Sequence, residues 1–175
     1  MKVYLFLDED GFCEGWGSNE EANSIPYEIE DDEVLQGIMK YRYVDGQLIY
    51  DETKALLSAK DSRKYKARKQ FLDLLGKGFE ITILGTTYTY PYDGDGKAYL
   101  DKVYELCRSG LIDEATFSFK KDDEDVIINV DRINVTEMWL LSYLHEENLK
   151  RKLNDYNTRV ENAQTLEELR AIVLE

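Results

Sequence analysis

The chain has 175 residues, with 36 acidic and 22 basic side chains, so its formal net charge is −14 at pH 7. This length suffices for one domain or two small modules with a hydrophobic core that needs no disulfides. The negative charge repels nucleic-acid phosphates and anionic lipid surfaces, so we expect neither nucleic acid nor membrane among the partners.

The cysteines and the apolar segments exclude several further classes of protein. Cys13 and Cys107 are far apart and have no neighbouring ligands at metal spacing, so we expect two buried, reduced thiols and no zinc site. No window approaches the roughly 18 apolar residues of a membrane span, and the N-terminus lacks the pattern of a signal peptide. We therefore expect a protein that stays in the cytoplasm.

Charge is distributed unevenly along the chain. Residues 1–35 carry eleven acidic side chains against Lys2 alone, whereas residues 54–70 carry seven basic side chains against Asp61. Opposite charges of this kind favour head-to-tail contacts or contacts between modules.

The first 51 residues predict a hairpin-rich N-terminal module. Val3, Leu5 and Leu7 alternate with aromatic residues, which predicts a strand with two apolar faces, and Asp10-Gly11 leads to a second strand near residues 12–16. Asp45-Gly46 is a strong two-residue turn signal for a second hairpin. The short helix expected between the hairpins is interrupted by Gly37.

Residues 52–78 predict a helix that connects two modules. It is apolar near its ends and polar and basic in its middle, and Gly76 and Gly78 suit its C-terminus. We expect the middle to stay accessible and the end to dock on the next module.

Residues 79–175 predict an α+β module of two hairpins and three helices. The hairpins span residues 79–90 and 116–130, and the first helix spans residues 93–110. Asn134 and Glu137 have the spacing of a capping box that would open a long helix, and Thr165 and Glu168 have it for a terminal helix. The long helix carries a narrow, coiled-coil-like row, which we call the helix seam: Leu149, Leu153, Tyr156, Val160 and Ala163.

Two segments show a resemblance to known proteins. The first is residues 79–173, where five features follow in order: the motif Gly85-Thr86-Thr87-Tyr88, the helix at residues 93–110, the hairpin at residues 116–130, the long helix from Asn134 and the segment AQTLEEL at residues 163–169. This order resembles a domain of unknown function at the C-terminal end of many phage tail and baseplate proteins. The start KVYLFLDEDGFCEGWG is similar to that of small proteins encoded beside tail-fibre genes in phages of Gram-positive bacteria. The resemblance implies no catalytic residues.

Candidate sites for chemistry have simpler structural interpretations. Asp93-Gly94-Asp95-Gly96 is similar to the opening of a calcium loop, but Lys97 occupies a ligand position, so a helix cap is the better interpretation. The acidic residues 122–125 predict a solvated turn, although they could hold a cation or a basic partner. His145 is the only histidine and has no nucleophile motif beside it. Four tyrosines near the first hairpin suit either an interface or ordinary strand packing: Tyr88, Tyr90, Tyr92 and Tyr99.

The resemblance implies a non-enzymatic structural protein of a phage or prophage tail or baseplate, which acts through protein–protein contacts. Alternatives are a tail-fibre assembly chaperone absent from the finished particle, and an acidic nucleic-acid mimic that inhibits a host defence protein. We expect no cofactor, tail or tail-fibre proteins as partners, and the host cytoplasm or the virion tail as location. The expected interface comprises a basic set and part of the helix seam, the latter also suiting a homo-oligomer: Lys64, Lys66, Lys69, Leu149, Leu153, Tyr156 and Val160.

Overall fold

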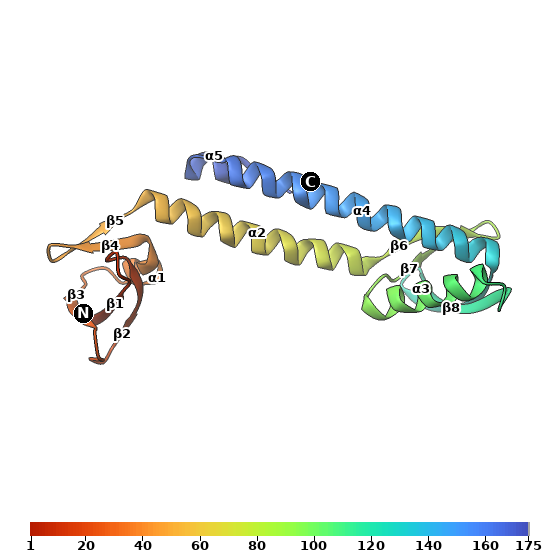
Figure 1. Ribbon diagram of the computed structural model, residues 1–175, viewed down its shortest axis with the longest axis horizontal. Helices are drawn as coiled ribbons and strands as arrows, with labels where there is room; N and C mark the ends of the chain where they lie inside the picture. Colours follow the sequence, from red (N-terminus) through yellow and green to blue (C-terminus); the bar gives the residue numbers. More distant parts are fainter. Residues whose placement is uncertain (175) are drawn as a thin grey trace. The chain divides into compact units, whose positions relative to one another are not determined.

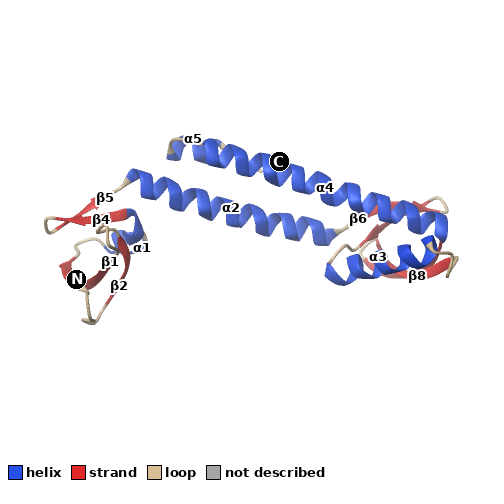
Figure 2. Ribbon diagram, viewed as in Figure 1, coloured by secondary structure: helices blue, strands red, loops and turns tan. Residues whose placement is uncertain are grey.

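The computed structural model describes residues 1–174 and confirms an α+β fold with antiparallel sheets (Figures 1 and 2). Contacts group the chain into two compact units. Unit 1 comprises Met1–Lys64 and Val160–Ile172, and unit 2 comprises Tyr65–Arg159 and the residues from Val173. The division falls within two helices, α2 (Glu52–Lys77) and α4 (Arg132–Asn162), and not at the boundaries expected after residues 51 and 78.

Unit 1 is built around a three-stranded antiparallel sheet with the order β2-β1-β3. The strands are β1 (Lys2–Leu7), β2 (Cys13–Gly17) and β3 (Ile25–Glu28). Val3 and Leu5 are fully buried on one face. The sequence analysis did not predict β3, whose position at the edge of the sheet tolerates Pro26.

The second hairpin of unit 1 confirms its turn signal. Strands β4 (Tyr41–Val44) and β5 (Gln47–Tyr50) pair around Asp45-Gly46, and both turn residues have positive φ, as a two-residue hairpin turn requires. The short helix α1 (Asp32–Gln36) ends at Gly37, where a 3₁₀ turn, η1 (Ile38–Lys40), begins. Leu35 and Ile38 complete the core below the first sheet.

The beginning of α2 packs within unit 1, which corrects the expectation that the basic middle of this helix is accessible throughout. Lys60 is only 8 % exposed, and its Nζ donates to the backbone oxygen of Glu161 at 2.6 Å. Arg63 donates to the backbone oxygen of Ile172, just after helix α5 (Leu166–Ala171). The carbonyl groups at the C-terminal end of a helix attract cations, and a lysine stem packs on apolar surface, so these basic residues are used internally.

Unit 2 contains a four-stranded antiparallel sheet in chain order. Strands β6 (Phe79–Ile83) and β7 (Thr86–Tyr90) form one hairpin, and β8 (Glu114–Lys121) and β9 (Glu124–Asp131) form the other. Both hairpins were predicted. They join through one register pair, Thr89 with Lys120, so the sheet is narrowest between the two hairpins.

Two helices supply the rest of the unit 2 core. Helix α3 (Gly94–Arg108) contributes Leu100 and Val103, and α4 contributes Val135 and Met138, which pack with inward residues of the sheet such as Phe119.

The cap of α4 corrects the sequence analysis. Asp131 Oδ1 accepts a hydrogen bond from the Asn134 backbone N–H at 2.9 Å, so Asp131 and not Asn134 caps the helix. The predicted N-cap of α5 at Thr165 is confirmed, because Thr165 Oγ1 accepts from the Glu168 N–H at 3.1 Å. The Glu168 carboxylate accepts from the Gln164 N–H at 2.7 Å and not from that of Thr165, so the reciprocal bond of the predicted capping box is displaced by one residue.

Candidate interaction surface

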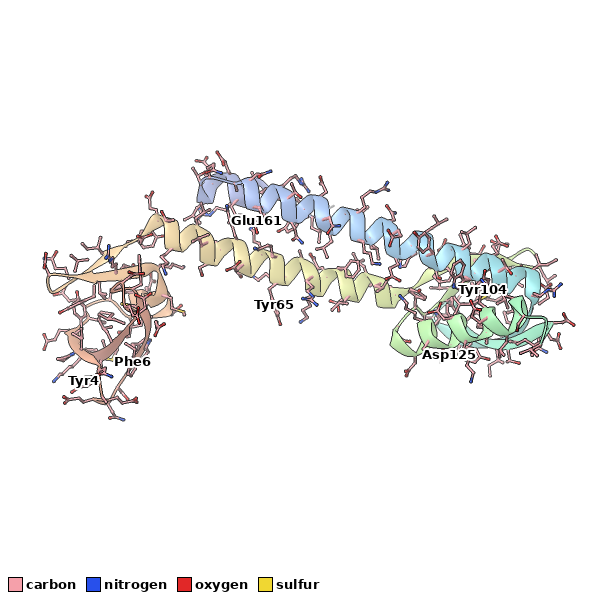
Figure 3. The ribbon with its side chains drawn as sticks, viewed as in Figure 1. Tyr4, Phe6, Tyr65, Tyr104, Asp125 and Glu161 are labelled. Atoms are coloured by element: carbon pink, nitrogen blue, oxygen red, sulfur yellow. The ribbon has the colours of Figure 1, made fainter. Side chains whose placement is uncertain are left out.

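A run of parallel aromatic rings lies on the outside of unit 2. Tyr104 of α3, labelled in Figure 3, belongs to this run. Its ring stacks on that of Trp139 of α4, with ring centroids 4.4 Å apart and planes 9° apart. Tyr143, one turn further along α4, is also nearly parallel to Trp139, at 6.4 Å and 15°. The Trp139 indole N–H donates to Asp101 at 3.2 Å, which fixes the ring in place. The stack is therefore a pre-ordered surface.

Apolar side chains extend this surface along the first half of α4. Ile133, Leu140, Tyr143 and Leu144 are each more than half exposed, whereas residues on the opposite side of the helix are in the core. The first half of α4 thus carries large apolar side chains on its exposed side as well as on its core side, and Thr136 and Glu137 are exposed among them. Apolar side chains on two sides are typical of a helix covered on two faces. We call the exposed set the α4 outer patch: Ile133, Trp139, Leu140, Tyr143 and Leu144.

The sequence analysis missed the α4 outer patch. A usable signal was present, because Leu140 and Leu144 are spaced i, i+4 on the side of the helix opposite Val135, and Trp139 and Tyr143 form a second i, i+4 pair beside them. The predictions were drawn instead from the later half of the same helix, where one apolar row stands out against charged neighbours.

The helix seam is used by the chain itself. Tyr156 and Val160 are buried and Leu149 and Leu153 are half-buried. Tyr156 lies in unit 2 and Val160 in unit 1, so each belongs to the packing of its own unit. Neither side chain is free to meet a second protein while the fold is intact.

The three predicted basic interface residues have different environments. Lys64 Nζ lies 2.6 Å from Glu161 Oε1 and 3.2 Å from Asp61, and these hydrogen bonds, with Glu161 first, raise the pKa of Lys64. Lys66 and Lys69 are exposed and make no ion pair within residues 1–174. Tyr65, 73 % exposed, and Leu72, 56 % exposed, accompany them in unit 2.

Helical spacing groups these exposed α2 residues on one side. Residues at i, i+3, i+4 and i+7 share a helix face. We call this set the α2 stripe: Tyr65, Arg68, Lys69 and Leu72. It combines an aromatic ring, two cations and a leucine.

His145 lies at the edge of the core of unit 2. Its ring is 6.2 Å from that of Phe79, and its Nε2 is shielded without a hydrogen-bond partner among the described residues. It faces the core side of α4 and not an open cleft.

Glu146 forms the tightest charged cluster of unit 2. Lys97 Nζ lies 2.6 Å from Glu146 Oε2, and Lys150 lies 2.9 Å from Oε1. The hydrogen bond from Lys97, followed by the one from Lys150, lowers the pKa of Glu146. The cluster ties α3 to α4.

The other candidates have structural roles. Asp93 Oδ1 accepts from the Gly96 N–H at 2.8 Å and caps α3, which confirms the helix-cap interpretation. Residues 122–125 are exposed around the β8–β9 turn. Tyr90 and Tyr92 are buried in the core, and burial raises the pKa of Tyr90. Among residues 1–174, no group of three or more potential ligand side chains could hold a metal ion.

Both cysteines are free and buried. Desolvation, followed by the charge of Asp8, raises the pKa of Cys13 to about 11, and burial also raises that of Cys107. A thiol with such a pKa is a poor nucleophile at neutral pH.

Polar and apolar side chains of unit 1 line a hollow of about 420 Å³. Glu52 is its only carboxylate, and no histidine, cysteine or lysine accompanies it, so it offers no acid–base pair. It is lined by Tyr50, Glu52, Thr53, Leu56, Gln164, Thr165 and Leu166.

Comparison with models of protein families, with curated proteins and with solved structures finds no match. In the part of the chain that the structure describes, no helix has the length and apolarity to cross a membrane. The fold therefore defines the class, an antiparallel α+β protein, and the surface features above carry the functional argument.

Proposed function

We propose that this protein is non-enzymatic and binds another protein through the α4 outer patch. The observation that carries the proposal is the exposure of Leu140, Tyr143 and Leu144 on a helix whose opposite face is already in the core. A single exposed leucine is ordinary, but a contiguous apolar set with ordered aromatic rings is informative.

The composition of the patch fits a protein interface. Tryptophan and tyrosine are enriched at interfaces because each buries a large rigid area and keeps a polar group for a hydrogen bond. Covering the exposed part of a leucine or tyrosine side chain contributes on the order of 1 kcal/mol. Because the Trp139 ring is already held by Tyr104 and Asp101, little side-chain entropy is lost on binding.

The resemblance of residues 79–173 to a phage tail and baseplate domain suggests the partner. We propose a phage or prophage tail, baseplate or tail-fibre protein, with the chain either a particle component or an assembly chaperone. Mass spectrometry of purified particles separates these two roles, because a chaperone is absent from the finished particle.

Capture by the tagged protein from prophage-induced cells tests the proposal. The double variant Leu140→Glu/Leu144→Glu places two charges in the patch and should abolish capture of the partner while leaving the fold intact. The matched control, Asn154→Glu/Thr158→Glu, places the same charges on exposed positions in the later half of α4 and should retain capture. Equal capture by both variants would contradict the proposal.

A further inference from the structure

The α2 stripe is a second unpartnered surface, independent of the α4 outer patch. The basic residues before it, Lys60, Arg63 and Lys64, are bound to α4 and the end of the chain, but Arg68 and Lys69 make no ion pair within residues 1–174. Figure 3 shows the Tyr65 side chain standing out from α2. A surface complementary to the α2 stripe has apolar side chains in its middle and carboxylates at its edges.

The N-terminal part of unit 1 has an excess of unpaired carboxylates. Of the eleven acidic residues in positions 1–35, Asp8 alone lies in an ion pair within the described chain, at 3.9 Å from Lys54. Within the described residues of unit 1, Lys54 is therefore the only residue of the basic segment that pairs with these carboxylates, because Lys60, Arg63 and Lys64 have other partners.

The first sheet also carries two aromatic side chains on the face that does not contact the core, and we call them the aromatic floor. Tyr4 and Phe6 alternate with the buried Val3 and Leu5 along β1 and so lie on the other face of the sheet (Figure 3). Their neighbours on β2 are Gly17 and Gly15, which have no side chains to cover the rings.

The residues around these two rings on β3 and in the loop between β2 and β3 include a proline and several carboxylates. Pro26 lies opposite Tyr4 on β3, and Glu28 lies on the same face at the next pair in register, where its partner on β1 is Lys2. Glu20 and Glu21 are exposed in the loop between β2 and β3. We call this surface the β1 outer face: Tyr4, Phe6, Gly15, Gly17 and Pro26.

The unit already places cations over aromatic rings. Lys2 lies 5.2 Å from the Tyr4 ring centroid, and Lys54 and Arg42 lie 4.1 and 5.3 Å from that of Phe12. The ring of Phe6 has no such cation within residues 1–174. Carboxylates near a ring attract the same cation through their own charge, so a ring and carboxylates together favour a cation at that place.

We propose that the α2 stripe of one copy docks on the β1 outer face of a second copy. Arg68 and Lys69 would lie among Glu20, Glu21 and Glu28, and Tyr65 and Leu72 would cover the aromatic floor. The two surfaces differ, so the contact is heterologous, and each added copy leaves one free surface of each kind for the next.

The net charge of −14 does not prevent this contact at physiological salt. The Debye length is about 8 Å at 0.15 M ionic strength, so repulsion between distant parts of two copies is screened, whereas charges in contact still attract. Charged contacts of this kind set the partner and the register more than the affinity. The proposal is independent of the α4 outer patch, so either can fail without the other.

Sedimentation velocity over a range of protein concentrations tests the proposal. The wild-type chain should show sedimentation coefficients that rise with concentration. The variant Lys66→Glu/Arg68→Glu/Lys69→Glu, which reverses both cations of the α2 stripe and the exposed Lys66 beside it, should weaken self-association at least about tenfold. The control, Lys102→Glu/Lys121→Glu/Lys152→Glu, makes the same change in net charge on exposed lysines elsewhere in unit 2 and should remain close to wild type.

A charge swap makes the test specific. The variant Glu20→Lys/Glu21→Lys/Glu28→Lys should not self-associate either, but its basic β1 outer face should bind the acidic α2 stripe of the first variant. Restored association in the mixture of the two supports the docking of these surfaces. A wild-type chain that stays monomeric at every concentration, equal weakening by the control, or a mixture that does not associate would each overturn the proposal.

Discussion

At the scale of single residues, a few side chains fix the geometry of whole elements. Gly78 joins α2 to β6 with φ of +84°, and a Cβ at this position would lie 1.8 Å from the backbone oxygen of Tyr90. A backbone clash of this kind cannot be relieved by rotating a side chain. The residue is thus required for the β6–β7 hairpin to start where it does.

Replacing Gly78 with alanine should therefore destabilise unit 2 strongly. We expect a loss of at least about 2 kcal/mol in the free energy of unfolding, from the positive φ and the clash together. Chemical denaturation followed by circular dichroism measures this. Gly46→Ala is a suitable control, since its φ is +86° but no atom lies within 4 Å of its added Cβ, so it should cost less.

The Glu146 cluster predicts a dependence of stability on pH. Because the folded-state pKa of Glu146 lies below its ordinary value of 4.5, its contribution to stability is fully present above pH 4.5 and is lost as the pH falls through the folded value. Glu146→Gln should cost about 1 kcal/mol at pH 7, after allowance for the partial exposure of Lys97, and the cost should vanish on acidification. Glu147→Gln, which removes only the exposed contact with Lys150, should have a smaller effect. A cost for Glu146→Gln that persists at pH 3 would show that packing and not charge is responsible.

At the scale of elements, the start of α4 and the middle of α2 were decided by contacts outside the local pattern. Asn134 and Glu137 have the spacing of a capping box, yet strand β9 runs on to Asp131 and leaves this carboxylate at the position that reaches the Asn134 N–H. The charge of the middle of α2 predicted that all of its basic residues are exposed to solvent. Lys60 is instead buried against the end of α4.

The cap assignment leads to a direct comparison of two variants. Asp131→Ala should lower the free energy of unfolding by about 1 kcal/mol, since it removes the acceptor for the first turn of α4. Asn134→Ala should cost less, because the Asn134 backbone N–H keeps its acceptor. A larger loss in the free energy of unfolding for Asn134→Ala than for Asp131→Ala would show that Asn134 is the cap.

The lysines of α2 should differ in chemical reactivity. We expect an acylating reagent, read out by mass spectrometry, to modify Lys66 and Lys69 rapidly and Lys60 slowly, because Lys60 Nζ is bound to a backbone oxygen and shielded. Unfolding in denaturant should remove the difference. Equal rates in the folded protein would mean that the packing of α2 in unit 1 opens readily.

At the scale of the whole molecule, the charge is borne mainly by one part of the chain. Residues 1–35 contain eleven acidic side chains and one lysine, and a single ion pair is formed there within the described chain. Uncompensated like charges oppose the compact state, and salt screens them. Moderate salt should therefore raise the melting temperature of unit 1, as followed by the fluorescence of Trp16 in the variant Trp139→Phe, where it is the only tryptophan. A melting temperature that falls with salt would indicate that attraction outweighs repulsion in this unit.

The sequence by itself determined the antiparallel α+β class, the four hairpins and the helix caps at Asp93 and Thr165. Turns and caps depend on hydrogen bonds between residues only two to four positions apart, so a local pattern contains them. The tertiary structure alone decided which helix faces stay exposed and which chain segments form a unit. The helix seam and the first half of α4 are both apolar rows, and only the packing shows that Tyr156 and Val160 are buried whereas Leu140 and Leu144 are open. Burial depends on contacts between residues distant in sequence, such as Lys60 with Glu161, and no local pattern contains them.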